Sequence, residues 1–390
     1  MSLDSNLDLP ATHDRQGGIA VSERRIINIG SLDLELGGQL DSVDVAFETY
    51  GTFDGTNAVL VEHALTGDSR VTSHGSKNES ESGWWHEVVG QGKALDTDKW
   101  FVVCANVLGG CQGTTGPSSI HPDGRAWGSR FPRITVRDQV AAEYALAKAL
   151  KIERFHSILG GSMGAMRTLE WIIQHPQSVG SALLLATSAI ASADQIGIQA
   201  TQIAAITNDP YWYGGDYYNQ SDGSGPRVGL AIARKIAHLS YRCETELTAR
   251  FGVQPQTNEN PLSPKIVGRD QGAGRFAVQS YLDHHGEKLV ARFDAGSYVI
   301  LTDVMNTHDV SRGRGDLAST LGSISVPVVV GGIDTDRLYP ISQQEYLALL
   351  IPTCESLSII DSVHGHDGFL IETQAVSELV RKTLELSSRD

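Results

Sequence analysis

The chain has 390 residues, 41% of them hydrophobic, and its formal net charge at pH 7 is −15. This length and apolar content suffice for one large α/β domain with room for an insertion. The negative charge argues against nucleic acid or an anionic membrane as a partner, and it requires a locally basic site for any anionic substrate.

Three further features bear on the compartment. The four cysteines form no C-x-x-C pair and no metal-ligand spacing, so we expect free thiols, no bound metal and a cytoplasmic location. Residues 1–18 lack a basic start followed by an apolar core, so we expect no signal peptide. The most apolar windows, such as residues 181–193, are too short and too rich in Ala and Ser for a membrane span.

Strand and helix patterns alternate through the first half of the chain. The predicted strands are residues 24–36, 43–50, 58–62, 100–105 and 182–186, together with a short apolar run that ends before Ser162. Residues 69–82 have the composition of a long surface loop, and residues 135–150 show helical spacing. Strands that alternate with helices predict a mostly parallel sheet with helices on both faces.

The pattern changes between about residues 190 and 310, where the chain is helical without obvious strands. Strand patterns return at residues 326–330 and 356–361, and a helix is expected over residues 374–386. We therefore predict one α/β core formed by residues 1–189 and 313–390, with a helical lid inserted over residues 190–312.

The most informative motif is the G-x-S-x-G sequence from Gly160 to Gly164, with Ser162 at its centre. An apolar run enters it and an amphipathic segment leaves it, which is the strand–turn–helix context of a nucleophile elbow. We expect glycine at both ends because neighbouring backbone crowds such a turn. A strand–helix turn with an idle serine is the alternative, since the motif also occurs by chance.

A nucleophilic serine needs a base and an acid that orients the base, in the chain order Ser, Asp or Glu, His for this kind of elbow. The strand at residues 326–330 leads to Asp334 and Asp336, and the strand at residues 356–361 leads to His364 and His366. All four candidates follow strand ends, where ligands bind in open α/β sheets. These patterns leave both choices open.

An oxyanion hole requires two backbone N–H donors. Met163, which follows the nucleophile, provides one candidate, and Leu65 in the loop after the third predicted strand provides the other. The alternative for the Leu65 loop is a plain turn.

Several segments together resemble the homoserine O-acyltransferase family of α/β-hydrolase-fold enzymes. They are His63–Asp68 (HALTGD), Asn106–Pro117 (NVLGGCQGTTGP), Gly160–Gly164 (GGSMG), Ala233-Arg234 with Tyr241-Arg242, Phe293–Ala295 with Ser297-Tyr298, Asp336–Pro340 (DRLYP), and His366-Asp367 with Phe369-Leu370. The match extends from about residue 25 to residue 385. The chain departs from the family at Gly368, where Ala is common, and at Arg70, where His is common and the choice of acyl donor could be influenced.

The resemblance implies an α/β-hydrolase fold with Ser162 as nucleophile, Asp336 as orienting acid and His366 as base. It also implies that Arg234 and Asp367 bind the amino-acid substrate. The implied reaction is transfer of an acyl group, acetyl being favoured, from acyl-CoA to L-homoserine on the way to methionine. It involves no cofactor or metal, since acetyl-CoA is a co-substrate, and the family favours a homodimer.

The residues give weaker support of their own for Arg234. It lies opposite an apolar stripe that includes Val228 and Ile232, so it would be a solvated arginine unless its face lines the cleft. There it could bind a carboxylate through two hydrogen bonds. Asp367 could pair with an ammonium, or bond to its own loop.

Three rival functions remain. The first is an esterase or thioesterase with the same triad, and the second is a relative that uses succinyl-CoA or serine. The third, a non-catalytic protein of this fold, would have lost a member of the triad.

Overall fold

A computed structural model of the chain describes residues 24–73, 82–220, 225–263 and 274–387. The expected absence of a signal peptide in residues 1–18, and most of the surface loop expected at residues 69–82, fall outside these ranges. Within them, no helix is long and apolar enough to cross a membrane.

The core is an eight-stranded sheet in the order β1-β4-β8-β5-β9-β10-β11-β12. Its strands are β1 (Arg25–Asn28), β4 (Asp44–Tyr50), β5 (Ala58–Glu62), β8 (Phe101–Ala105), β9 (Phe155–Gly161), β10 (Val179–Leu185), β11 (Val328–Ile333) and β12 (Leu357–Ile360). The pairs from β8 to β12 are parallel, whereas β4 runs antiparallel to both β1 and β8. The mostly parallel sheet expected from the sequence is confirmed.

The first expected strand, residues 24–36, was wrong as one element. β1 ends at Asn28, and the backbone turns at Gly30, which has a φ of +80°. A separate hairpin follows, in which β2 (Leu32–Asp33) pairs with β3 (Gln39–Leu40). The small parallel pair β6 (Val89–Gly90) and β7 (Leu95–Asp96) was not expected, because two-residue strands leave no periodic pattern.

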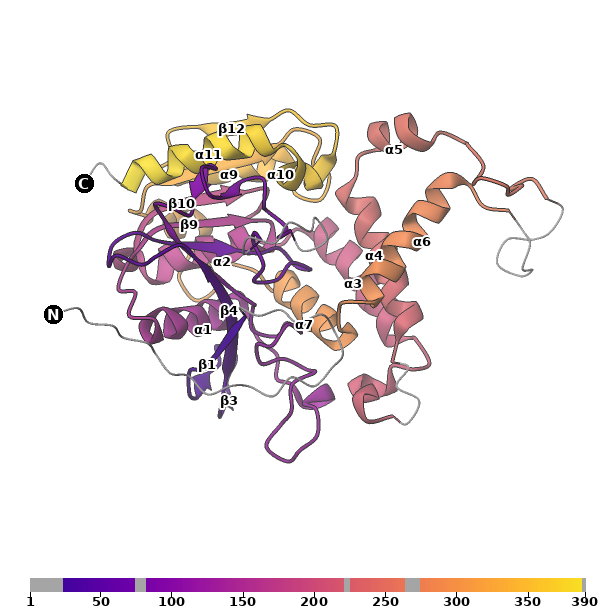
Figure 1. Ribbon diagram of the computed structural model, residues 1–390, viewed down its shortest axis with the longest axis horizontal. Coiled ribbons are helices and arrows are strands. Elements are labelled where there is room, and N and C mark those ends of the chain that lie inside the picture. The colour runs from indigo at the N-terminus through magenta and orange to yellow at the C-terminus, as the bar shows by residue number, and fades with distance from the viewer. Residues whose placement is uncertain (1–23, 74–81, 221–224, 264–273, 388–390) are drawn as a thin grey trace.

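Helices cover both faces of the sheet (Figure 1). On one face α1 (Val136–Ala149), α2 (Met163–Gln174), α8 (Leu317–Gly322) and α9 (Ile341–Leu350) enclose an apolar core, and on the other α11 (Thr373–Leu386) encloses a second one. Alternate residues of β9 and β10 enter the two cores: Ile158 packs with the first and Leu159 with the second. A capping box between Thr135 and Asp138 begins α1 within one residue of the expected position.

Between β10 and β11 the chain forms a helical block that stands to one side of the sheet (Figure 1). It contains α3 (Ala193–Thr207), α4 (Arg227–Tyr241), α5 (Glu244–Phe251), α6 (Ala277–Val290) and α7 (Ala295–Asn306). α4 packs against both α3 and α6. The boundaries of this lid at residues 190 and 312 remain a prediction.

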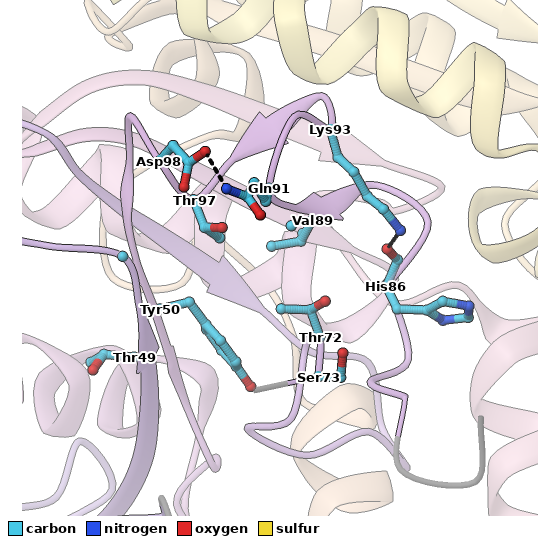
Figure 2. Close-up of a pocket in the computed structure, with 12 residues that line it drawn as sticks. Thr49, Tyr50, Thr72, Ser73, His86, Val89, Gln91, Lys93, Thr97 and Asp98 are labelled. Atoms are coloured by element: carbon cyan, nitrogen blue, oxygen red, sulfur yellow. Dashed lines mark hydrogen bonds between the residues drawn. The ribbon is translucent and has the colours of Figure 1, made fainter. Parts of the chain in front are cut away.

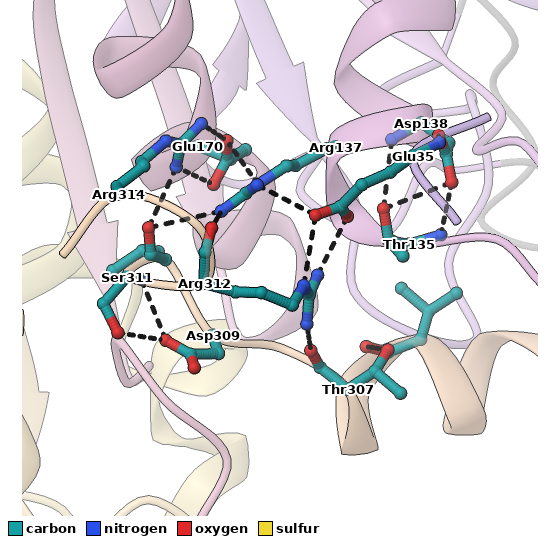
Figure 3. Close-up of polar contacts among 12 residues, drawn as sticks. Glu35, Thr135, Arg137, Asp138, Glu170, Thr307, Asp309, Ser311, Arg312 and Arg314 are labelled. Atoms are coloured by element: carbon teal, nitrogen blue, oxygen red, sulfur yellow. Dashed lines mark hydrogen bonds and ion pairs between the residues drawn. The ribbon is translucent and has the colours of Figure 1, made fainter. Parts of the chain in front are cut away.

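The segment that returns from the lid to the core is fixed by arginine–glutamate pairs (Figure 3). Arg312 and Arg137 both donate to Glu35, at 2.9 and 2.8 Å, and Arg314 donates to Glu170 at 2.9 Å. Glu35 follows β2 and Glu170 lies on α2, so the bonds from Arg312 and Arg314 join the end of the lid to two separate parts of the core.

Candidate active site

β9 ends at Gly161, and α2 begins at Met163, so Ser162 occupies a one-residue turn between them. Its φ of +56° is a strained conformation for a residue with a side chain. A Cβ on Gly160 would lie 2.4 Å from Thr168 Oγ1, and one on Gly164 would lie 2.1 Å from the Glu62 carbonyl oxygen. The expected crowding at both glycines is confirmed.

The structure brings Ser162, His366 and Asp336 into one hydrogen-bonded chain. His366 Nδ1 lies 2.6 Å from Asp336 Oδ2, and His366 Nε2 lies 2.8 Å from Ser162 Oγ. A carboxylate can only accept, so the Nδ1 proton faces Asp336 and Nε2 is left to accept from the serine hydroxyl. All three side chains are buried.

Asp336 and His366 each have a neighbour with a different role. Asp336 Oδ1 accepts from the backbone N–H groups of Leu338 and Tyr339, which fixes the carboxylate. Asp334 Oδ1 instead accepts from Ser362 N at 3.0 Å and joins two loops. His364 lies 3.3 Å from the Arg242 guanidinium, outside the chain of bonds to Ser162.

The electrostatics of His366 suit a general base. Burial by itself would lower the pKa of its imidazole, but the charge and hydrogen bond of Asp336 outweigh burial, and the pKa is raised. A more basic imidazole takes the serine proton more readily, while Asp336 stabilises the imidazolium that results.

Leu65 and Met163 are both buried, and Leu65 lines the same cavity as Ser162. Among the described residues, neither backbone N–H group has a hydrogen-bond acceptor. Met163 is also the first residue of α2, where the helix dipole favours negative charge. The two amides are thus unpaired donors beside Ser162.

Of the two expected substrate residues, Arg234 lies on α4 of the lid, whereas Asp367 lies in the core directly after His366. Arg234 is half-buried on α4 with its guanidinium 5.5 Å from the centre of the Tyr241 ring, and no carboxylate of the described ranges pairs with it. Asp367 is paired with Arg242, its Oδ2 lying 3.1 Å from Arg242 Nε. Burial raises the pKa of Asp367 despite that arginine. Arg70 lies 4.0 Å from Glu48, among residues of the core.

The apolar stripe of α4 faces outward in the single chain. Val228 is 67% exposed and Ile232 is 42% exposed, whereas Ala233 and Ala237 are buried. The helix packs on its neighbours through another face, which includes Leu230, and Arg234 is half-buried beside Ala233.

The polar lining of the cavity at Ser162 was not predicted from the sequence. The cavity measures about 20 Å³ and is lined by Leu65, Ser162, Gln199, Gln202, Ser240, Tyr241, Met305, Leu338 and Tyr339. Gln199 Oε1 and Tyr339 Oη are buried without a partner in the described structure. Glutamines at positions 195, 199 and 202 share one face of α3, and this helical spacing in an otherwise apolar segment was the available signal.

A larger hollow of about 630 Å³ shares no residue with the cavity at Ser162 (Figure 2). Its polar side chains bond to one another and to nearby backbone: Gln91 donates to Asp98 at 2.9 Å, and Lys93 donates to the His86 carbonyl oxygen. Among the described residues that line it, no hydroxyl group is hydrogen-bonded to the His86 ring. The four cysteines are free thiols, and no group of metal-ligating side chains occurs in the part of the chain that is described.

Comparison with known proteins identifies a matching family model and a relative that is similar over nearly its whole length. A family model described as the alpha/beta hydrolase fold matches residues 57–373. A protein from Mycobacterium sp. (strain KMS) named homoserine O-acetyltransferase is 51% identical over 385 residues, which cover 98% of each chain.

Two solved structures share the fold at lower identity. The homoserine O-acetyltransferase from Bacillus anthracis has a TM-score of 0.82 at 23% identity and covers 93% of this chain and 97% of its own. Esterase E22 has the same TM-score at 24% identity and covers 93% of this chain and 99% of its own. The fold alone therefore does not separate a transferase from an esterase.

Proposed function

This chain belongs to the homoserine O-acetyltransferases, a family of α/β-hydrolase-fold enzymes, and from this membership we infer its function. It transfers the acetyl group of acetyl-CoA to the hydroxyl of L-homoserine, a step of methionine biosynthesis. We propose that Ser162, His366 and Asp336 perform this transfer. The observation that carries the proposal is the hydrogen-bonded chain from Ser162 Oγ through His366 to Asp336.

In the first half-reaction His366 Nε2 takes the Ser162 proton as Ser162 Oγ attacks the thioester carbonyl. The Leu65 and Met163 amides stabilise the oxyanion, and the CoA thiol leaves with the proton from His366. Acetyl-Ser162 remains.

In the second half-reaction His366 removes the proton from the homoserine hydroxyl as its oxygen attacks the carbonyl carbon of acetyl-Ser162. The bond from that carbon to Ser162 Oγ then breaks, Ser162 Oγ takes the proton back from His366, and O-acetylhomoserine is released. We propose that Arg234 binds the carboxylate of homoserine and that Asp367 binds its ammonium. Asp367 then exchanges part of its pairing with Arg242 for the substrate. Holding the hydroxyl in place can contribute on the order of 7 to 11 kcal/mol at the extreme, which lets transfer compete with hydrolysis by water.

The residues that support this mechanism call for no cofactor or metal. We propose that acetyl-CoA is a co-substrate and that the enzyme works in the cytoplasm. We further propose that the division into core (residues 1–189 and 313–390) and lid (residues 190–312) serves to cover the acyl-enzyme and exclude water.

We also propose a homodimer formed through the lid. The outward apolar stripe on α4, which includes Val228 and Ile232, supports such an interface because exposed apolar surface on a monomer is unfavourable. Sedimentation of the wild-type chain should give a dimer, and Ile232→Glu should give a monomer. A monomeric wild type would contradict this proposal.

A competition assay tests the reaction. The enzyme is given equal acetyl-CoA and succinyl-CoA, with and without L-homoserine, and the products are identified by mass. We expect O-acetylhomoserine only when homoserine is present. O-succinylhomoserine would assign the other donor, and free acid formed regardless of homoserine would identify an esterase, the second candidate that the likeness to esterase E22 favours.

A further inference from the structure

The loop that carries Leu65 begins at His63, directly after β5, and has no regular secondary structure of its own. An oxyanion donor must keep its N–H aimed at a position that the substrate oxygen occupies only during reaction. Some other part of the protein therefore has to hold the loop.

The His63 side chain bridges this loop to the segment after β8. Its Nδ1 lies 2.8 Å from the carbonyl oxygen of Ala64, the residue before Leu65, and its Nε2 accepts from Val107 N at 3.1 Å. Both bonds require a neutral ring with the proton on Nδ1. Burial and the nearby Arg167 lower the pKa of His63 to about 3, so the ring is neutral at physiological pH.

The backbone of His63 is held from the opposite side by Arg167, which lies on α2 one turn after the nucleophile and is fully buried. Arg167 Nη2 donates to the His63 carbonyl oxygen at 2.6 Å. Its Nη1 donates to Glu143 on α1 at 2.8 Å, and Glu143 also accepts from Trp171 Nε1 at 3.0 Å.

Arg167 also faces a second carboxyl group. Glu62 lies 3.2 Å from Arg167 Nη2, and burial, together with the charge of Glu143, raises the pKa of Glu62 well above its usual range although Arg167 acts to lower it. The bonds from the guanidinium to Glu143 and to the His63 carbonyl oxygen hold the arginine beneath the loop.

We propose that Arg167 and His63 are positioning residues of the oxyanion hole, which hold the Leu65 amide in place for both half-reactions. Helix α2 then positions both N–H donors. The Met163 N–H belongs to the helix itself, and the Leu65 N–H is held in place through the Arg167 side chain. This inference rests on the proposed function for the identity of the acceptor, but not for the acylation of Ser162.

Paired substitutions at His63 separate positioning from packing. His63→Asn keeps a donor for the Ala64 carbonyl, whereas His63→Gln keeps an acceptor for Val107 N and loses the bond to the loop. Acylation is followed as the burst of p-nitrophenolate from p-nitrophenyl acetate. Deacylation is followed as the transfer of the acetyl group from Ser162 to homoserine. His308→Gln, a change at a buried histidine bonded to the Ser188 carbonyl, is the matched control.

For His63→Gln we expect both rate constants to fall by the same factor, about 10- to 100-fold, because a misplaced donor loses part of an oxyanion contact. The affinity for a trifluoromethyl-ketone analogue of acetyl-CoA, which forms an oxyanion on Ser162, should fall equally, with KM for homoserine unchanged. His63→Asn should stay within a few-fold of wild type. His308→Gln should lower the melting temperature without slowing the burst.

Arg167→Lys tests the second link, since lysine keeps the charge but cannot donate to Glu143 and His63 as a fork does. We expect the same loss in both half-reactions, and no further loss when it is combined with His63→Gln. Independent, multiplying losses would overturn the link through His63. Equal effects of His63→Asn and His63→Gln, or a change confined to KM for homoserine, would overturn the positioning role. A wild type that acylates but makes no O-acetylhomoserine would instead contradict the proposed function alone.

Discussion

The catalytic triad and the lid residues Arg234 and Gln199 differ in how completely their side chains are paired. On the core side Ser162, His366 and Asp336 satisfy one another, and each follows a strand of the sheet. On the lid side Arg234 has no ion-pair partner among described residues, and Gln199 Oε1 is buried without a hydrogen bond.

This difference is what a two-substrate transferase requires. Groups that perform chemistry gain from being fixed before the substrate arrives, because reorganisation then costs little in the transition state. Groups that bind an amino acid must keep their hydrogen-bonding capacity free for it. Core substitutions should therefore act on rate constants, and lid substitutions on KM for homoserine.

Among the variants, Ser162→Ala should have the largest effect on activity. Without the nucleophile no acetyl-enzyme forms, and kcat should fall by about 10⁶-fold. Mass spectrometry of the protein after incubation with acetyl-CoA should show the acetyl adduct in the wild type only. Transfer at near wild-type rate would refute the covalent route.

Asp336→Asn should have the next largest effect, about 10⁴-fold in kcat, since an amide can hold the wrong tautomer of His366. Asp336 raises the pKa of His366, so its loss should lower that pKa and move the acidic limb of the kcat/KM profile to lower pH. Asp334→Asn is the matched control, because asparagine can still accept from Ser362 N. If Asp334→Asn had the larger effect, the acid would be misassigned.

Arg234→Met tests the lid side. Loss of a charge-assisted pair with the homoserine carboxylate should raise KM for homoserine by about 10- to 100-fold. The burst of acetyl-enzyme from acetyl-CoA should be unchanged. Arg227→Met, at an exposed position on the same helix, should alter neither quantity. A slower burst in Arg234→Met would mean that this arginine serves the donor instead.

The smallest expected effect is at Gln199. Gln199→Leu removes a buried group that lacks a partner, so the protein should gain about 1 kcal/mol of stability while KM for homoserine rises a few-fold. Gln202→Leu should be destabilising instead, because Gln202 Oε1 accepts from Tyr298 Oη at 2.7 Å. Thermal melts measure the stability of both variants, and steady-state kinetics measure KM for homoserine. If Gln199→Leu were destabilised as much as Gln202→Leu, the Gln199 amide would have to be hydrogen-bonded.

The features that depend on residues adjacent in the chain, namely the elbow at Ser162 and the order of strands and helices, could be predicted from the sequence alone. The elbow at Ser162 needs a strand, small residues and a helix in immediate succession, and these are local patterns. The alternation of strands and helices likewise predicted the parallel sheet, and helical spacing placed α1 and α11 to within a residue or so.

Only the tertiary structure decided which of several similar residues meet. Asp334 and Asp336 both follow β11, and their different partners, Ser362 and His366, come from a loop 28 and 30 residues further along the chain. The apolar stripe of α4 indicated a core face, yet the helix packs through a different face that includes Leu230 and Ala233, and Arg234 is half-buried there. Contacts between distant segments depend on the packing of whole elements, which no local pattern records.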